Sequence, residues 1–273
     1  MFRKASLVCL IIGSICTASD AAAPTSIAKL TAEFYRTSRL PLVFVGHVAH
    51  RIQQPGPCAI VIPTPIEFVI DQVLEGVLAG NTVTIQFPLC LSVPASLDSN
   101  GPVIVFAEYD DRNWGSRAEH VFAATPENVE RAETSVRRHL RQVLSRFLLA
   151  HKSESAIAFV GTVTSIPSSS EAKTCGPSKP MAVRFRKDQK VYGELMGIDA
   201  HVSFSTCIDP LPHAPIRLGL QVIVVGAQSG QAIVGGYVTP MVTSDVRLLL
   251  LPTPKMKQFV VDALHAGSDR QSR

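Results

Sequence analysis

The stretch FVIDQVLEGVLAGNTVTIQFPLC, from Phe68 to Cys90, occurs a second time in altered form as FRKDQKVYGELMGIDAHVSFSTC, from Phe185 to Cys207. The two stretches match at a series of positions, all at a constant offset of 117 residues. The matching pairs include Phe68/Phe185, Asp71/Asp188, Gln72/Gln189, Gly76/Gly193, Gly80/Gly197, Phe87/Phe204 and Cys90/Cys207. A match of this extent predicts that the chain contains one structural unit twice.

The length and composition agree with two globular units. A chain of 273 residues can form two domains that each bury a core of their own. Hydrophobic residues make up 46% of the chain and charged residues 18%, a balance that is typical of globular rather than disordered or coiled-coil proteins. The formal charge of +4 is too small to indicate a nucleic-acid-binding protein by itself.

The N-terminus has the pattern of a secretory signal. Arg3 and Lys4 precede a largely apolar run, and small residues follow it around Ala21 and Ala22. We therefore predict a signal peptide at 1–22, a linker at 23–40, and a secreted or periplasmic protein. The alternative is a membrane anchor, but the apolar run is shorter than the roughly 20 residues that a spanning helix needs.

The mature chain would keep four cysteines, Cys58, Cys90, Cys175 and Cys207. The members of each pair, Cys58 and Cys90 or Cys175 and Cys207, are 32 positions apart, so the duplication predicts one disulfide within each copy. Such a loop closure stabilises a fold by roughly 3 to 4 kcal/mol in the chain-entropy model. The alternative is a four-cysteine zinc site, but the chain has no CxxC spacing and export favours oxidation.

Each copy contains several short apolar strands with glycine and proline between them, followed by an amphipathic helix. This pattern predicts a mainly β fold with α, in which two tandem barrels each carry a C-terminal helix. We expect the first unit at 41–151 with a helix at 126–149, and the second at 152–267 with a helix at 254–266. Gly267 is expected to end the second helix, and 268–273 to form a tail.

Three features recur in both copies in the same order: an opening strand of the type FVG, the motif F-x-x-D-Q-x-x-x-G followed by a strand that reaches a cysteine, and a glycine followed by branched apolar residues. This order resembles the netrin-module family, the OB-fold family that includes the tissue inhibitors of metalloproteinases. The residues concerned are Val43–Gly46, Phe68–Gly76, Cys90 and Gly101–Ala107 in the first copy, and Phe159–Gly161, Phe185–Gly193, Cys207 and Gly219–Val225 in the second.

The resemblance implies a five-stranded barrel packed by a terminal helix, used for protein binding in secreted proteins and in some members for protease inhibition. In the inhibitors, the mature chain starts with a cysteine whose amine and carbonyl bind the catalytic zinc of the protease. This chain departs from that pattern because Ala22–Ser26 contains no cysteine. The inhibitory residue therefore has no counterpart here.

Candidate chemical sites are few. His47 and His50 could bind a metal, but three positions apart on a strand they point to opposite faces. Glu108, Asp110 and Asp111 could bind a cation such as calcium, although such clusters more often form solvated turns. The usual hydrolase, metalloprotease and nucleotide-binding motifs are absent from the chain, so we predict no catalytic residue, cofactor or metal.

The expected first helix carries a basic stripe. The spacing of Glu127 with Arg131, and of Glu133 with Arg137, is typical of a solvated face with ion pairs one helical turn apart. The sharper alternative is that the stripe binds an acidic partner or a polyanion. Its residues are Arg131, Arg137, Arg138, Arg141 and Arg146.

These features together predict an exported, non-enzymatic binding module whose partner is another extracytoplasmic protein. The alternatives are a secreted protease inhibitor and a hydrolase with a site between the repeats. Aromatic residues make up only 6% of the chain and stand mostly at core-like positions, which argues against nucleic acid as the partner.

Overall fold

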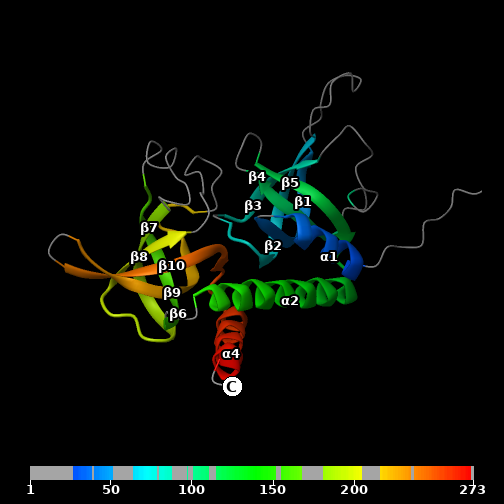
Figure 1. Ribbon diagram of the computed structural model, residues 1–273. Coiled ribbons are helices and arrows are strands. Elements are labelled where there is room, and N and C mark those ends of the chain that lie inside the picture. The colour runs from blue at the N-terminus through cyan, green and yellow to red at the C-terminus, as the bar shows by residue number, and fades with distance from the viewer. Residues whose placement is uncertain are drawn as a thin grey trace, which may run out of the picture.

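The computed structural model describes residues 27–38, 40–51, 64–78, 80–87, 97, 101–110, 115–151, 155–167, 181–204, 216–234 and 237–271. Within these residues the chain forms two closed five-stranded barrels. Figure 1 shows the barrels side by side, with helices α1, α2 and α4 packed outside them. The four cysteines and the expected signal peptide lie outside the described residues. The two disulfides and the signal peptide therefore remain predictions.

The first barrel is built from the first copy of the repeat. Its strands are β1 (Pro41–Arg51), β2 (Thr64–Glu75), β3 (Thr82–Phe87), β4 (Val103–Asp110) and β5 (Gly115–Ala123). They follow the order β1-β2-β3-β5-β4 around the barrel, and β4 pairs with β1 to close it. Neighbours are antiparallel except β3 and β5, which pair in parallel at Ile85 and Gln86.

The second barrel repeats this order. Its strands are β6 (Ser155–Ser165), β7 (Met181–Tyr192), β8 (Asp199–Phe204), β9 (Gln221–Val234) and β10 (Tyr237–Leu250). Here β8 and β10 form the parallel pair. Five-stranded barrels with such crossed connections have the OB architecture. The prediction of two tandem OB-like barrels, each followed by a helix, is therefore confirmed.

The two barrels match in detail as well as in strand order. The pairing of β1 with β2 shifts register after Val43, Val45 and Val48. The pairing of β6 with β7 shifts at the equivalent points, after Ala158, Val160 and Val163. Such bulges bend a strand and increase its twist, which helps to close a small barrel.

The turn after the second strand also repeats. Gly76 has a φ of 88° and Gly193 a φ of 69°. A Cβ at Gly193 would lie 2.5 Å from the carbonyl oxygen of Ala156. The positive φ and the close approach together explain why both copies carry glycine there.

Three helices are described outside the barrels. Helix α1 (Ile27–Thr37) lies in the segment that we expected to be a linker, and its Phe34 is buried. This corrects the linker prediction: an apolar face with Ile27, Thr31 and Phe34 on successive turns packs against the rest of the protein. Helix α2 (Pro126–Ala150) begins at the cap Thr125, whose hydroxyl accepts a hydrogen bond from the Asn128 backbone amide.

Helix α4 (Pro254–Gln271) extends beyond its expected end at position 266 and includes Gly267. A Cβ at Gly267 would lie 2.9 Å from Leu148 Cδ1 of α2. The glycine therefore permits close packing of α4 on α2 instead of ending the helix, and part of the expected tail at 268–273 is helical.

The buried apolar residues form three clusters. One fills the interior of the first barrel and includes Phe44, Phe68 and Ile85. A second fills the interior of the second barrel around Phe159 and Phe185. The third contains residues of all three helices. They are Phe34 of α1, Val136, Leu140, Val143 and Phe147 of α2, and Phe259, Val260 and Leu264 of α4.

This third cluster also includes residues of both barrels, among them Phe106 of β4 and Leu248 of β10. We call it the shared layer. Helix α2 runs through it and contacts β2 and β4 of the first barrel and β10 of the second. The two barrels are thus joined through a common apolar layer. Figure 1 shows α2 extending from one barrel to the other.

Candidate functional site

The arginines of the predicted basic stripe all lie on α2, but ion pairs divide them into two groups. Arg131 is paired with Glu127. Arg137 Nη2 lies 3.6 Å from Glu133 Oε2. Both pairs have the spacing that the sequence predicted. The charges of these two arginines are therefore partly neutralised by their own helix.

The other three arginines have exposed side chains, and no ion pair links them to a carboxylate among the described residues. Arg138, Arg141 and Arg146 border a shallow hollow of about 600 Å³ on the outer side of α2. The Arg141 guanidinium lies 5.7 Å from the centre of the Phe259 ring, a favourable cation–π distance. We call these three residues the arginine face.

A groove of about 420 Å³ lies beside the arginine face, between α1 and α2. Tyr35 and Arg36 border it on the α1 side, and Arg138, His139 and Arg146 on the α2 side. Arg247 of β10 reaches it from the second barrel. The groove therefore collects cationic side chains from three elements that are distant in the sequence.

The inner end of the groove is a buried polar cluster. The rings of Tyr35 and His139 stack with their centres 4.0 Å apart and an angle of 10° between their planes. The Tyr35 hydroxyl donates a hydrogen bond of 2.6 Å to Glu75 Oε2. His139 Nε2 lies 3.6 Å from Glu75 Oε1, which is too long for a hydrogen bond.

Burial controls the ionisation of this cluster. Glu75 is only 4% exposed, and burial raises the pKa of its carboxyl to about 8, although the Tyr35 hydroxyl and Arg247 both oppose the rise. Burial and the neighbouring Glu75 also raise the pKa of Tyr35 well above its usual value. Near neutral pH the Glu75 side chain therefore keeps its proton.

His139 is affected in the opposite direction. Burial and the charges of Arg247 and Arg146 together lower its pKa to about 4, although Asp245 opposes the shift. The imidazole is thus neutral near pH 7, and the contact with Glu75 is not an ion pair. Within the described part of the chain, His139 Nε2 and Glu75 Oε1 have no hydrogen-bond partner.

Arg247 is fixed by Asp245, two residues before it on β10. Its Nε donates to Asp245 Oδ1 at 2.9 Å and its Nη2 to Asp245 Oδ2 at 2.5 Å. The backbone amide of Arg247 donates to the same carboxylate at 2.9 Å. This bidentate pair holds the guanidinium of the second barrel next to the buried acid of the first.

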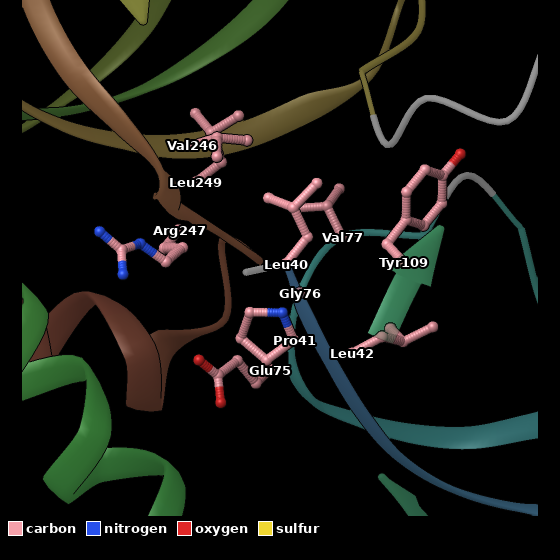
Figure 2. A pocket seen from close by; sticks show the side chains of 10 residues that line it. All are labelled: Leu40, Pro41, Leu42, Glu75, Gly76, Val77, Tyr109, Val246, Arg247 and Leu249. Carbon is pink, nitrogen blue, oxygen red and sulfur yellow. The ribbon is translucent and has the colours of Figure 1, made fainter. Parts of the chain in front are cut away.

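A small cavity of about 40 Å³ lies on the other side of this cluster, between the barrels. Figure 2 shows apolar side chains such as Leu40, Val77 and Val246 around it, while the polar ends of Glu75 and Arg247 turn away from them. A cavity of this volume accommodates one or two water molecules. It offers no room for the substrate of a hydrolase with a site between the repeats.

The two polar residues retained in the duplicated stretch connect neighbouring elements. Gln72 Nε2 donates a hydrogen bond of 3.2 Å to Glu133 Oε1 of α2. Gln189 Oε1 accepts one of 2.6 Å from Lys257 Nζ of α4. Each glutamine therefore links the second strand of its barrel to the helix that follows that barrel. Asp188 accepts a hydrogen bond of 2.5 Å from Thr162.

The sequence-predicted metal candidates are not brought together. His47 Nδ1 lies 3.4 Å from a carboxylate oxygen of Asp71, and His50 is exposed. Among the described residues, no three His, Cys, Asp or Glu side chains are placed to hold a metal ion. The side chain of Asp110, as well as Asp111, lies outside the described residues.

Sequence reasoning missed the polar cluster of Tyr35, Glu75, His139, Asp245 and Arg247. One signal was available: the position of Glu75 in the repeat is occupied by Tyr192 in the second copy. A charged residue in one copy opposite an aromatic residue in the other marks a place where the copies differ in their surroundings.

A search for membrane-spanning helices among the described residues finds none of sufficient length and apolarity.

No family model matches the chain, and no curated protein matches it. Among solved structures, Drosophila Unr CSD456 is similar at 13% identity with a TM-score of 0.17, over 78% of this chain and 63% of that one. A deletion mutant of the single-stranded DNA-binding protein from Thermus aquaticus is similar at 8% identity with a TM-score of 0.22, over 75% of this chain and 90% of that one.

The second match corrects one expectation from the sequence. We argued against a nucleic-acid partner, but a similar solved structure belongs to a single-stranded DNA-binding protein, so that argument no longer stands. At TM-scores of 0.17 and 0.22 the likeness carries no argument for any particular partner of this chain. What the fold itself establishes is a pair of OB-like barrels joined by a common helical layer.

Proposed function

We propose that this protein is a non-enzymatic binding module that holds a polyanionic partner against the arginine face of α2. The observation that carries the proposal is the exposure of Arg138, Arg141 and Arg146 on one side of a helix without an ion pair to a described carboxylate. Unpaired guanidinium groups are suited to carboxylates and phosphates, which they can bind through two parallel hydrogen bonds.

The position of α2 supports this role. The opposite side of the helix is buried in the shared layer through Val136, Leu140 and Val143. The backbone that carries the arginines is therefore held by both barrels. A surface fixed in this way loses less conformational entropy on binding than a surface on a flexible loop.

The partner is defined here by its charge: a polymer segment with closely spaced carboxylates or phosphates. Export and one disulfide in each barrel complete the proposal, joining Cys58 to Cys90 and Cys175 to Cys207. Protein binding outside the cytoplasm, which the netrin-module resemblance implies, is one form of it. Nucleic acid is the other polymer to be tested.

The test measures binding of two fluorescently labelled polymers, poly-L-glutamate and single-stranded DNA, by anisotropy. We expect at least one of them to bind, with an affinity that falls as salt increases. Replacing Arg138, Arg141 and Arg146 together by Gln should weaken binding by about tenfold or more.

The matched control removes the same net charge elsewhere. Arg131, Arg186 and Lys190 are exposed cations that already pair with Glu127, Asp188 and Glu194. Replacing these three by Gln should change the affinity by no more than about twofold. Equal losses in the two triple variants, or no binding of either polymer by the wild type, would overturn the proposal.

A further inference from the structure

The groove between α1 and α2 has more positively charged side chains at its border than the neighbouring described carboxylates pair with. Asp245 pairs with Arg247, and Glu33 lies 3.8 Å from Arg36. No described carboxylate pairs with Arg138 or Arg146. The residues that border the groove include no Asp or Glu. Two cationic side chains therefore face the groove without a counter-ion from the described part of the protein.

The nearest buried acid does not supply that counter-ion. Glu75 accepts a hydrogen bond from the Tyr35 hydroxyl, and its other oxygen lies 3.6 Å from His139 Nε2. Because burial raises the pKa of Glu75 to about 8, this carboxyl is uncharged near neutral pH. The field inside the groove is consequently set by the arginines.

The hydroxyls of Thr31 and Ser135, which are 3.3 Å apart, join the α1 and α2 sides of the groove and add polar groups to its lining. His139 also borders the groove, but its Nε2 lies 3.6 Å from Glu75 Oε1 and belongs to the buried polar cluster.

The volume of about 420 Å³ falls within the range of about 300 to 1,000 Å³ that is usual for small-molecule sites. This volume is too small for a folded protein and large enough for a phosphorylated metabolite. Size and charge thus agree on the kind of ligand.

From these observations we propose that the α1–α2 groove is a binding site for a small phosphate-bearing anion, held between Arg138 and Arg146. A tetrahedral phosphate presents oxygens to two guanidinium groups on different sides and leaves another for a hydroxyl. The inference goes beyond the proposed function, because it concerns a small ligand in a different hollow, which Arg141 does not border. Arg138 and Arg146 border both hollows, so the two ligands would compete for them.

The test uses pyrophosphate as the probe and the full chain in isothermal titration calorimetry. The wild type should bind it saturably. Ala32→Glu places a carboxylate at the mouth of the groove, on an exposed position of α1 where it can pair with Arg36 one turn later. This variant should lose about tenfold or more in affinity for pyrophosphate.

Two controls separate the groove from net charge and from the arginine face. Ala182→Glu makes the same change on an exposed position of β7, and Arg141→Gln alters the arginine face at a residue that does not border the groove. Both should bind pyrophosphate within about twofold of the wild type. Arg141→Gln should still weaken polymer binding, so failure of one proposal is distinguishable from failure of the other.

A melting curve checks the fold of Ala32→Glu. If that variant melts at a lower temperature than the wild type, the surface double variant Arg138→Gln/Arg146→Gln is measured in its place. It should also lose about tenfold or more in affinity for pyrophosphate. No binding of pyrophosphate by the wild type at millimolar concentration, an equal loss in Ala182→Glu, or an unchanged affinity in the deciding groove variant would overturn the assignment. Tighter binding of citrate than of pyrophosphate would overturn its phosphate specificity.

Discussion

The two barrels share strand order, bulge positions and turn glycines, whereas the helices that follow them differ in length, charge and contacts. Helix α2 has 25 residues and contacts both barrels. Helix α4 has 18 residues and packs on β7 and on α2. The barrels are therefore one plan used twice, and the helices are where the copies have diverged.

The same divergence appears under the helices. In the first copy Glu75 ends β2 and faces His139 of α2 across 3.6 Å. In the second copy Tyr192 ends β7 and packs edge-on against His265 of α4, with ring centres 5.2 Å apart. The aromatic contact of the second copy, which tolerates solvent, thus corresponds to a buried acid in the first copy. The first copy thus has a polar cluster next to a cationic groove where the second copy has a contact between two rings.

This difference locates the candidate sites. Features common to both copies, such as the glutamines that link strand to helix, serve the fold. The arginine face lies on α2 alone, and the polar cluster occurs once in the molecule, because Tyr192 stands in the second copy where Glu75 stands in the first. The cluster draws on both copies, since it also contains Asp245 and Arg247 of β10. The asymmetry between the copies is the better guide to function.

The largest expected effect tests whether the barrels behave as one unit. Phe68 and Phe185 occupy equivalent positions and are both fully buried. Phe68→Ala and Phe185→Ala should each lower the free energy of unfolding by about 3 to 5 kcal/mol, through lost burial and the cavity left behind. Urea unfolding followed by circular dichroism should show one transition, shifted in both variants, because the shared layer couples the barrels.

Leu149 is 67% exposed and provides the control, since Leu149→Ala should change the free energy of unfolding by less than about 0.5 kcal/mol. Two separate transitions, with only one moved by each phenylalanine variant, would show that the barrels unfold independently.

The next effect concerns the buried acid Glu75, whose position is occupied by Tyr192 in the second copy. The unfolded chain ionises Glu75 above pH 4.5, while the folded protein keeps the proton up to about pH 8. Folding is therefore progressively disfavoured as the pH rises through that window. His139 acts in the opposite sense between about pH 4 and pH 6.5, because its folded-state pKa is lowered.

Above pH 6.5 only the Glu75 contribution remains of these two. We expect the free energy of unfolding to fall by about 2 kcal/mol between pH 6.5 and pH 8, at about 1.4 kcal/mol per pH unit. Glu75→Gln should remove this fall, since an amide does not ionise and can still accept the Tyr35 hydrogen bond. Glu67→Gln, on a partly exposed position of the same strand, should keep it. An unchanged slope in Glu75→Gln would contradict this account.

The smallest effect concerns the links that both copies retain. Gln72→Ala and Gln189→Ala each remove one exposed hydrogen bond to a helix. Each should lower the free energy of unfolding by about 0.5 kcal/mol in denaturant titrations. The double variant should show the sum, because the two residues have no common partner. A loss well above the sum would indicate that the links cooperate through the shared layer.

Much of the barrel architecture was predictable because its signals are local. Alternating apolar residues mark β3 and β8, and Gly76 and Gly193 mark the turns after β2 and β7. The last strand of each barrel was not identified. Strand β5 carries charged residues and β10 contains Pro240 and Asp245, so neither has a clear apolar alternation. Both pair in parallel with a distant strand, which local pattern does not reveal.

The sites were predictable only in part. The basic stripe and its two ion pairs follow from helical spacing, which is a property of the sequence itself. Which arginines stay unpaired depends on the whole surroundings of α2. The role of α1 was also missed, because an amphipathic segment of eleven residues gives no indication of what covers its apolar face.

The sequence by itself determined that one β unit is built twice, that each copy ends in a helix, and that α2 is basic. These properties follow from periodicity and from the constant offset between the copies. Only the tertiary structure decided that Tyr35, Glu75, His139 and Arg247 meet, since they come from α1, β2, α2 and β10. The physical reason is that the shared layer packs the helices against both barrels. Packing between distant elements determines how deeply Glu75 and His139 are buried, and their burial determines whether they are charged.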